Sequence, residues 1–325
     1  MNFQEEIQLL RAEIKRQLEP LIGEKCIIVD APYYRNIGDV LIWQGIEDFL
    51  KLNHKNLLYV NSISTFQFPE IENDTTILLM GGGNFGDLWR ELQEFRLKVV
   101  SHYLYNRIIM FPQSVWYEDK NLIDKDVEIF RNHQNIYMCA RDRWSYDFMK
   151  KYFPTNNIFL VPDMAFYIDE SRLVQYRKKY LLKKLYFKRL DKEATLSMPI
   201  DLGKDYDVHD WPTIENNSNT FYIIYKMWGL ARRLEYFPGI SNILYSISDI
   251  YASKFVKNNL VKQACKFLSP YGSVVTTRLH AMILSVLLHK NVEYIDNTTG
   301  KLSAFADTWL KECENIKLYN PKDCK

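Results

Sequence analysis

The sequence predicts an α/β protein with two Rossmann-like domains that face each other across a cleft. The chain has 325 residues, which is too long for one ordinary hydrophobic core and suits two domains. Short apolar runs alternate with helical patterns, as expected for parallel sheets whose two faces are covered by helices. Polar and charged residues follow several of these runs directly, at the strand ends where open α/β sheets bind ligands.

The composition is that of a globular protein and narrows the function classes. Hydrophobic residues make up 47% and charged residues 25% of the chain, and the net charge of +2 argues against a large nucleic-acid interface. No apolar stretch approaches the roughly 20 residues of a membrane-spanning helix. The cysteines are scattered and form no C-x-x-C pair, so we expect a reducing, cytoplasmic environment. They are Cys26, Cys139, Cys265, Cys313 and Cys324.

The first half of the chain is predicted to begin with a helix and to continue as strand–turn–helix units. Residues 1–18 carry apolar side chains at helical spacing between charges, which indicates an amphipathic helix and not a signal peptide. We expect helices up to Leu50 after a turn at 36–39, over about 87–101, and up to about Tyr152. The expected strands are residues 26–30, 56–60, 75–80, 107–111, 135–140 and 158–161.

A domain boundary is predicted near residues 167–173, which gives domains of residues 1–168 and 169–325. The second domain is expected to contain a long polar loop at 201–219 and a mainly helical segment at 221–255 that Pro238-Gly239 interrupts. Its expected strands are residues 184–188, 273–277 and 291–295, with an apolar helix at 281–288.

Arg278-Leu279-His280 is the most informative triplet, because it lies between the strand at 273–277 and the helix at 281–288. A guanidinium offers a planar fork to phosphate or carboxylate, and an imidazole can move a proton near neutral pH. Together they indicate a small anionic substrate and acid–base chemistry. The alternative is that both residues only cap or pack the start of the helix.

Three strand ends of the first half carry further candidate residues. Asn36-Ile37-Gly38-Asp39 supplies a turn former, a glycine and a carboxylate at a helix start, and its alternative is a turn with an N-cap. Gly81-Gly82-Gly83-Asn84 follows a strand, and such a glycine-rich turn lets backbone N–H groups approach an anion. It matches neither a G-x-G-x-x-G fingerprint nor a P-loop. Arg141-Asp142 places another arginine at a strand end, either as a ligand contact or as a structural pair.

Short motifs occur along the chain in an order that resembles the polysaccharide pyruvyl transferase family. The resemblance covers about residues 28–310 and is weakest over about 191–255. It implies a fold similar to the two-domain glycosyltransferases called GT-B, and transfer of pyruvate from phosphoenolpyruvate to a sugar, with a cyclic ketal as product. The motifs are Tyr34–Asp39, Gly81–Asn84, Pro112–Ser114, Arg141-Asp142 with Ser145, Val161–Asp163, Thr277–His280 and Asp296–Lys301.

The resemblance assigns Arg278, Leu279 (through its backbone) and His280 to the donor, with Arg141 as the second arginine. The chemistry then suggests His280 as general acid for the methylene carbon and Asp39 as base for a hydroxyl. No metal or cofactor is expected beyond the donor substrate. Lys301 would support the donor phosphate, and the alternative is that it is a solvated lysine of a loop. The remaining candidates for substrate binding are Asn36, Gly38, Gly82, Gly83, Asn84, Gln113, Ser114 and Lys301.

The expected partners are phosphoenolpyruvate and a sugar or lipid-linked oligosaccharide, with no nucleic acid. The basic run 175–189 and Arg232-Arg233 raise the hypothesis of peripheral association with an anionic membrane, with a solvated face as the alternative. Asp205-Tyr206-Asp207 has the D-x-D form of metal-dependent glycosyltransferases, but chance explains it more readily in a polar loop. The alternative functions are a glycosyltransferase that uses a nucleotide sugar and a non-catalytic sugar-binding relative. The acceptor sugar is left open.

Overall fold

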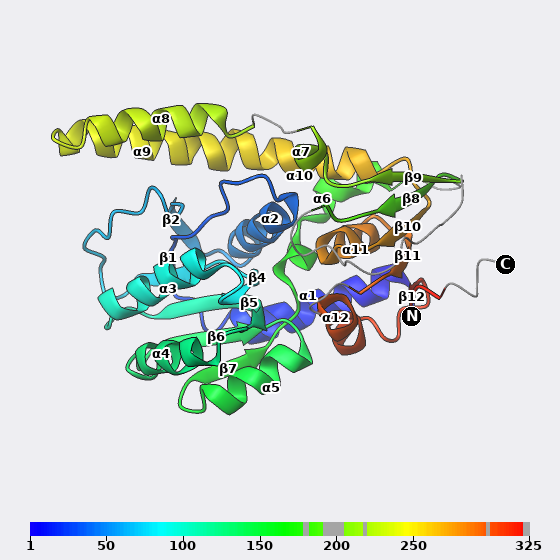
Figure 1. The fold of residues 1–325 in the computed structure, drawn as a ribbon, viewed down its shortest axis with the longest axis horizontal. Helices are drawn as coiled ribbons and strands as arrows, with labels where there is room; N and C mark the ends of the chain where they lie inside the picture. The colour runs from blue at the N-terminus through cyan, green and yellow to red at the C-terminus, as the bar shows by residue number, and fades with distance from the viewer. Residues whose placement is uncertain (178–181, 191–204, 217–219, 297–299, 321–325) are drawn as a thin grey trace.

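The computed structural model describes residues 1–177, 182–190, 205–216, 220–296 and 300–320. The described chain forms two parallel sheets with helices packed around them (Figure 1). The first sheet has seven strands and the second has five. This arrangement confirms the predicted α/β class and is consistent with two Rossmann-like domains.

The first sheet has the strand order β2-β1-β3-β5-β6-β7, and β4 pairs with the extended end of β5. Every neighbouring pair is parallel. The central strand β3 is buried at every position, as expected for a sheet covered on both faces. The strands are β1 (Lys25–Ile28), β2 (Asn56–Val60), β3 (Thr76–Leu79), β4 (Gly82–Gly86), β5 (Ile108–Trp116), β6 (Ile136–Ala140) and β7 (Asn157–Leu160).

The helices of this half begin at side-chain caps that the sequence supplies. Asn2 forms a capping box with Glu5 at the start of α1, and Asn36 accepts a hydrogen bond from the Gly38 backbone at the start of α2. The amphipathic N-terminal helix is therefore confirmed. The helices are α1 (Phe3–Leu18), α2 (Ile37–Leu52), α3 (Arg90–His102), α4 (Lys120–Arg131), α5 (Arg143–Tyr152) and the short 3₁₀ turn η1 (Met164–Tyr167).

The glycine-rich segment Gly81–Asn84 was predicted as a turn, and this was wrong, although the helix expected after it is present as α3. Residues 82–86 form strand β4, because β5 continues past Phe111 to Trp116 and offers its backbone as a pairing partner. Gly82 has a φ of 137°, a conformation open to glycine and costly for other residues, so a glycine is required inside this strand.

The second sheet has the order β12-β11-β10-β8-β9, again entirely parallel. The predicted helical segment and its break are confirmed, since α8 ends at Arg233 and α9 begins at Pro238. The strands are β8 (Lys184–Phe187), β9 (Tyr206–His209), β10 (Ser273–Thr276), β11 (Asn291–Tyr294) and β12 (Ile316–Leu318). The helices are α6 (Glu170–Leu173), α7 (Pro212–Glu215), α8 (Tyr222–Arg233), α9 (Pro238–Tyr251), α10 (Lys257–Leu268), α11 (Leu279–Leu287) and α12 (Lys301–Trp309), with η2 (Val174–Tyr176) and the π-helical turn η3 (Ala252–Val256).

The prediction of a polar loop at 201–219 was wrong for its described part. Residues 206–209 form the edge strand β9 and 212–215 form α7, whereas 201–204 and 217–219 lie outside the described residues. The D-x-D sequence therefore falls at the start of a strand. Asp207 accepts a hydrogen bond from the Tyr271 hydroxyl at 3.0 Å.

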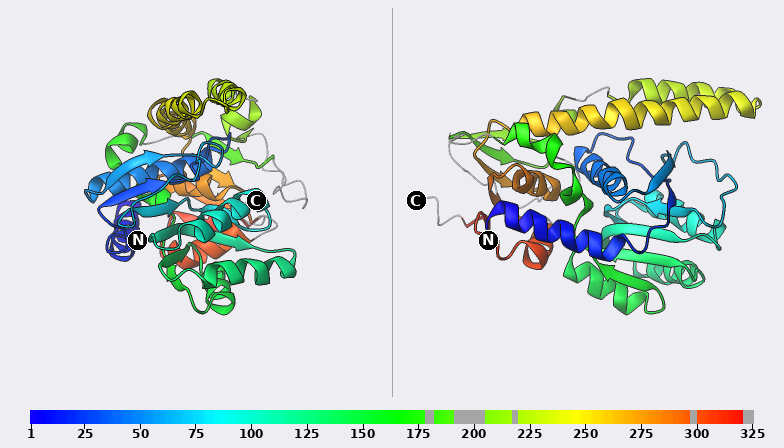
Figure 2. Two further views of the ribbon diagram at one scale, coloured as in Figure 1. Left: turned by 90° about the vertical axis from the view of Figure 1, so that its left-hand side faces the viewer. Right: turned by 180° about the vertical axis from the view of Figure 1, so that it is seen from behind.

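The two halves are tied together by elements that cross between them. Phe3 of α1 stacks on His289, and Lys257 of α10 pairs with Glu47 of α2. One hydrophobic cluster accordingly contains residues of both sheets, while a second cluster belongs to the first half. The helices α8 and α9 form a hairpin that runs along the first half, as Figure 1 and the right view of Figure 2 show. The boundary between domains 1–168 and 169–325 stays a prediction.

Candidate active site

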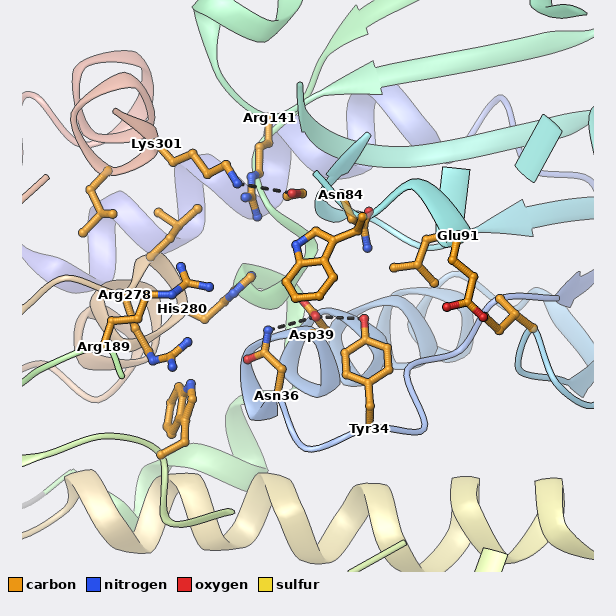
Figure 3. A pocket seen from close by; sticks show the side chains of 17 residues that line it. Tyr34, Asn36, Asp39, Asn84, Glu91, Arg141, Arg189, Arg278, His280 and Lys301 are labelled. Atoms are coloured by element: carbon orange, nitrogen blue, oxygen red, sulfur yellow. Dashed lines mark hydrogen bonds between the residues drawn. The ribbon is translucent and has the colours of Figure 1, made fainter. Parts of the chain in front are cut away.

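A cavity of about 440 Å³ is lined by residues of both halves of the chain (Figure 3). Most of its lining side chains follow the carboxyl ends of parallel strands, the edge at which such sheets bind ligands. The lining residues are Tyr34, Asn36, Asp39, Ile63, Gly83, Asn84, Trp89, Glu91, Leu92, Arg141, Arg189, Trp211, Arg278, Leu279, His280, Lys301 and Leu302.

One buried carboxylate joins two of the lining side chains. Oδ2 of Asp163 lies 3.3 Å from Nε2 of His280 and accepts a hydrogen bond from Arg141 at 3.0 Å. Burial opposes ionisation of Asp163, but the positive charges of His280 and Arg141 outweigh it and hold the pKa of this carboxyl at about 2. A carboxylate that is ionised at every physiological pH fixes the orientation of the His280 imidazole.

Arg278 is held by a second buried carboxylate. Its Nε and Nη2 atoms both donate to Asp210, with the Nη2–Oδ2 distance at 2.6 Å. Asp210 is fixed in turn by the backbone N–H groups of Leu190 and Trp211. The guanidinium is thereby locked by a fork-to-fork contact at the start of α11, with its remaining surface against the cavity.

Lys301 and Asn84 meet at the part of the cavity formed by β4. Lys301 is the first residue of α12, is almost fully buried, and donates to the carbonyl of Gly83 at 3.2 Å, so it is not a solvated loop lysine. Within the described part of the chain, the buried Oδ1 atom of Asn84 has no hydrogen-bond partner. A buried amide oxygen that lacks a partner and faces a cavity can accept a hydrogen bond from a ligand.

Asp39 is oriented by two neighbours on the loop after β1. The Tyr34 hydroxyl and the Asn36 amide each donate to its Oδ2 atom at 2.9 Å. Burial, reinforced by the Asp39 charge, raises the pKa of Tyr34 well above its usual value, so the phenol stays a hydrogen-bond donor. Asn36 therefore caps the start of α2, which was the alternative considered for this turn, and it also lines the cavity.

The cavity is divided electrostatically. Arg141, Arg189, Arg278, His280 and Lys301 gather toward one end, whereas Tyr34, Asp39 and Glu91 lie toward the other (Figure 3). The N-terminal turn of α11, which begins directly after Arg278, adds its dipole to the cationic end. Such a site can hold a compact anion at one end and a hydroxyl-bearing molecule at the other.

Four of the sequence candidates lie behind the lining. Gln113 donates to the carbonyl of Met80, and Ser114 accepts from Arg141 and donates to Asp142. Arg141 therefore pairs with Asp163 and reaches Asp142 only through Ser114. The backbone of Gly38 packs against His280, and Gly82 lies between Asp39 and Asn84. Direct substrate contact by these four residues stays a prediction.

Sequence reasoning missed several lining or supporting residues. Arg189 follows β8, and Asp163, the last residue of the Val161–Asp163 motif, follows β7, so the search for charged residues directly after strands that selected Arg141 and Arg278 would also have selected them. Asp210 follows β9, which was not predicted as a strand. The basic run 175–189 is not one solvated face where it is described. Arg177 bonds Glu170 and the Leu287 carbonyl, and Arg189 lines the cavity.

The described residues hold no group of three or more His, Cys, Asp or Glu side chains arranged to bind a metal ion. The four described cysteines are unpaired and buried, and Cys324 lies outside the described residues. Burial raises the pKa of Cys26 and of Cys265 to about 12, so neither is a ready nucleophile.

Comparison with known proteins gives one family and several relatives. Residues 36–298 match the family model for polysaccharide pyruvyl transferases, a range that includes Asp39, Arg141 and Arg278 through His280 but not Lys301. The chain is 32% identical over 318 residues to "Putative pyruvyl transferase EpsO" of Bacillus subtilis, covering 94% of this chain and 93% of that protein. It is 26% identical over 301 residues to "Pyruvyl transferase 1" of Schizosaccharomyces pombe, covering 89% and 71%.

A solved structure supports the fold independently of these sequences. An uncharacterised protein of Klebsiella pneumoniae superposes with a TM-score of 0.63 at 19% identity, covering 96% of this chain and 98% of that one. At this identity the likeness concerns the fold alone.

Proposed function

Because the chain belongs to the polysaccharide pyruvyl transferase family, we propose that it transfers pyruvate from phosphoenolpyruvate to a sugar and releases phosphate. The acceptor would be part of a cell-surface polysaccharide, such as an exopolysaccharide or capsule, or its precursor. The observation that carries this function is the shared cavity, in which arginines of both halves meet an imidazole.

The cationic end of the cavity suits the donor. Phosphoenolpyruvate carries a phosphate and a carboxylate on three carbons, and guanidinium groups bind both by paired hydrogen bonds. Asp163 and Asp210 offset part of the charge of Arg141 and Arg278, while Arg189 and Lys301 add further cations to the lining. This cluster of cationic side chains supports an anionic ligand.

His280 is the proposed general acid. Its proton would pass to the C3 methylene of phosphoenolpyruvate, which becomes a methyl group and leaves C2 electrophilic. A sugar hydroxyl oxygen bonds to C2, and its proton passes to a base, for which Asp39 is the candidate. A second hydroxyl oxygen then bonds to C2 as the C2–O bond to phosphate breaks. The products are the cyclic ketal and inorganic phosphate, which leaves with the second hydroxyl proton.

The opposite end of the cavity suits a sugar. Asp39 is oriented through its Oδ2 atom, which leaves Oδ1 for a substrate hydroxyl. Trp89 and Tyr34 line this region together with Glu91, and aromatic faces beside polar acceptors are typical of carbohydrate sites. Any sugar with a suitably placed pair of hydroxyls fits this chemistry.

The deciding experiment follows phosphate release from phosphoenolpyruvate against a panel of sugars, nucleotide sugars and lipid-linked sugars, with the product mass recorded. Pyruvyl transfer predicts phosphate release that requires an acceptor, and an acceptor heavier by one pyruvyl ketal. Phosphoenolpyruvate at 100 times its dissociation constant should raise the free energy of unfolding by about 2.7 kcal/mol, which a rise in melting temperature would reveal. A shift with uridine or guanosine diphosphate alone would instead indicate a glycosyltransferase. Sugar binding without phosphate release would indicate a non-catalytic relative.

We also propose a cytoplasmic location, in keeping with the free cysteines and the expected donor. Within the described residues, no helix is both long and apolar enough to span a bilayer.

A further inference from the structure

The α8–α9 hairpin exposes apolar side chains where helices of globular proteins normally expose polar ones. Ile240, Ile243, Ile247 and Ile250 recur at helical spacing on α9, and each is about half exposed. This stripe lies on one face of α9 and is not covered by the described protein.

The opposite face of α9 is polar and buried. Ser241 donates to the Ala231 carbonyl of α8, Ser248 accepts from Trp228, and Asp249 accepts from Asn61 and Thr65 of the first half. A helix in water buries its apolar stripe and exposes its polar one. The polarity of α9 is reversed, which indicates that its outer face meets an apolar phase.

The turn between the two helices continues this surface. Tyr236 is 87% exposed and Phe237 is 61% exposed, at the end of the hairpin that projects from the body of the protein (Figures 1 and 2). Arg232 and Arg233 immediately precede the turn and are exposed. Exposed aromatic residues beside basic ones are the composition of segments that lie in a membrane interface.

The charge of the hairpin decides between a membrane and a second copy of the chain. Over residues 222–256, which are all described, the exposed charged side chains are Lys226, Arg232, Arg233, Lys254 and one carboxylate, Glu235. A twofold contact would place this same cationic surface against itself, whereas an anionic surface complements it. We propose that the α8–α9 hairpin docks the protein onto an anionic lipid bilayer by inserting its turn and isoleucine stripe into the interface.

The base of the hairpin connects this surface to the cavity. Tyr225 of α8 donates to the carbonyl of Tyr33 at 2.9 Å, and Trp228 stacks on the Tyr33 ring. The following residues, Tyr34 and Asn36, line the cavity. A docked hairpin would hold the acceptor end of the cavity close to the membrane. Given the proposed function, this favours an acceptor carried on a lipid.

The test is sedimentation of the full chain with vesicles of equal parts phosphatidylglycerol and phosphatidylcholine, and with phosphatidylcholine vesicles. We expect binding to the anionic vesicles that weakens as salt rises. Arg232→Gln with Arg233→Gln should lower the partition constant about 30-fold, because each cation near an anionic surface contributes roughly fivefold to sevenfold. Tyr236→Ser with Phe237→Ser should lower it at least about tenfold.

Matched controls lie elsewhere on the surface. Lys150→Gln with Lys151→Gln on α5 removes the same charge, and Leu104→Ser with Tyr105→Ser removes a similar exposed apolar pair. Neither should alter vesicle binding. All variants should keep the wild-type melting temperature and their phosphate release with a water-soluble acceptor.

Three results would overturn the membrane assignment. The wild type could stay in the supernatant at low salt, or the hairpin variants could sediment like the controls. The wild type could also be a dimer that Tyr236→Ser with Phe237→Ser dissociates without any vesicle binding, which would make the hairpin a contact between copies. Sedimentation needs no substrate, so a failure of the proposed pyruvyl transfer would be seen separately.

Discussion

Nε2 of His280 lies 3.3 Å from Oδ2 of Asp163, and the two residues come from different sheets, one after β10 and the other after β7. Arg141 donates to the same oxygen atom, so one carboxylate links a proposed acid to a proposed anion-binding group. Asp163 does not line the cavity, and its role is therefore that of a positioning residue for both side chains.

Asp163→Asn should lower kcat by about 10- to 100-fold, the effect typical of losing a residue that orients a catalytic or ligating imidazole. KM for phosphoenolpyruvate should also rise, because Arg141 loses the carboxylate that orients it. A merely structural role would lower kcat and the melting temperature without changing KM. Asp163→Glu is the partial rescue, since it restores the charge.

The same variant should change acid stability with a defined sign. The pKa of Asp163 is held at about 2 in the folded protein, and an unfolded aspartate titrates near 4. The stability that this carboxylate contributes is therefore complete above about pH 4 and is lost as the pH falls through 2. Urea unfolding of wild type and Asp163→Asn should show a free-energy difference that shrinks over that window. A constant difference would contradict the assignment.

His280→Ala should reduce phosphate release by about 10²- to 10⁴-fold, the range that general acid–base catalysis supplies. The melting temperature should fall, because the buried Asp163 carboxylate loses one of its two cationic partners, so turnover is compared at a temperature at which the variant is folded. His102→Ala, at an exposed histidine of α3, is the control and should leave turnover unchanged. Turnover of His280→Ala within a few-fold of wild type would remove His280 from the role of acid.

Arg278→Lys keeps the charge but loses the planar fork that Asp210 holds. We expect KM for phosphoenolpyruvate to rise about 10- to 100-fold, since a hydrogen bond to a charged group contributes about 1.5–3 kcal/mol. Initial rates at varied phosphoenolpyruvate separate KM from kcat. An unchanged KM would place the donor away from Arg278. Lys184→Arg, on the exposed start of β8, is a control for exchange between the two cations.

Much of the site could be predicted from sequence, because ligands of parallel α/β sheets bind at the carboxyl ends of the strands and this depends on topology alone. Arg141, Arg278 and His280 each follow an apolar run that is readily recognised, and all three line one cavity. Asp210 could not be predicted in the same way, because the strand before it has no apolar run. This strand, β9 (Tyr206–His209), lies at the edge of its sheet, and each of its residues is exposed or partly exposed.

Other differences arise from tertiary context. The composition of β4 opposes a strand, and only the extended backbone of β5 makes one. The prediction of a mainly helical segment at 221–255 was correct for α9, but it did not tell which face of the helix is covered. The protein covers the face with Ser241 and Asp249 and leaves the isoleucines outside.

Gly38→Ala tests how closely α2 and His280 approach each other. A Cβ atom at residue 38 would lie 2.6 Å from Nδ1 of His280, so the imidazole would have to move. We expect kcat to fall at least about tenfold, because a displacement of this size misaligns a reacting group. Gly229→Ala on the exposed side of α8 is the control, since nothing lies within 4 Å of its new Cβ atom. It should add about 0.5–1 kcal/mol of stability and leave kcat unchanged. Wild-type kcat in Gly38→Ala would show that the imidazole position is not critical.

Asp249 joins α9 to the first half and should make that contact sensitive to pH. Burial raises the pKa of this carboxyl to about 6, although hydrogen bonds from Thr65 and Asn61 oppose the shift. Its pKa is raised above that of an unfolded aspartate, so the folded state binds the proton more tightly and stability falls as the pH rises from about 4 to 6. Asp249→Asn cannot ionise and should gain about 3 kcal/mol relative to wild type across that window.

Urea unfolding from pH 4 to 8 measures this difference, with Asp124→Asn, at an exposed position of α4, as the control. The amide of Asp249→Asn loses one charge-assisted hydrogen bond, but this cost is the same at every pH at which wild type is ionised. The slope of the difference therefore identifies the buried carboxyl independently of its absolute value. A difference that is flat between pH 4 and 6 would mean that Asp249 titrates normally and that the contact between α9 and the first half does not respond to pH.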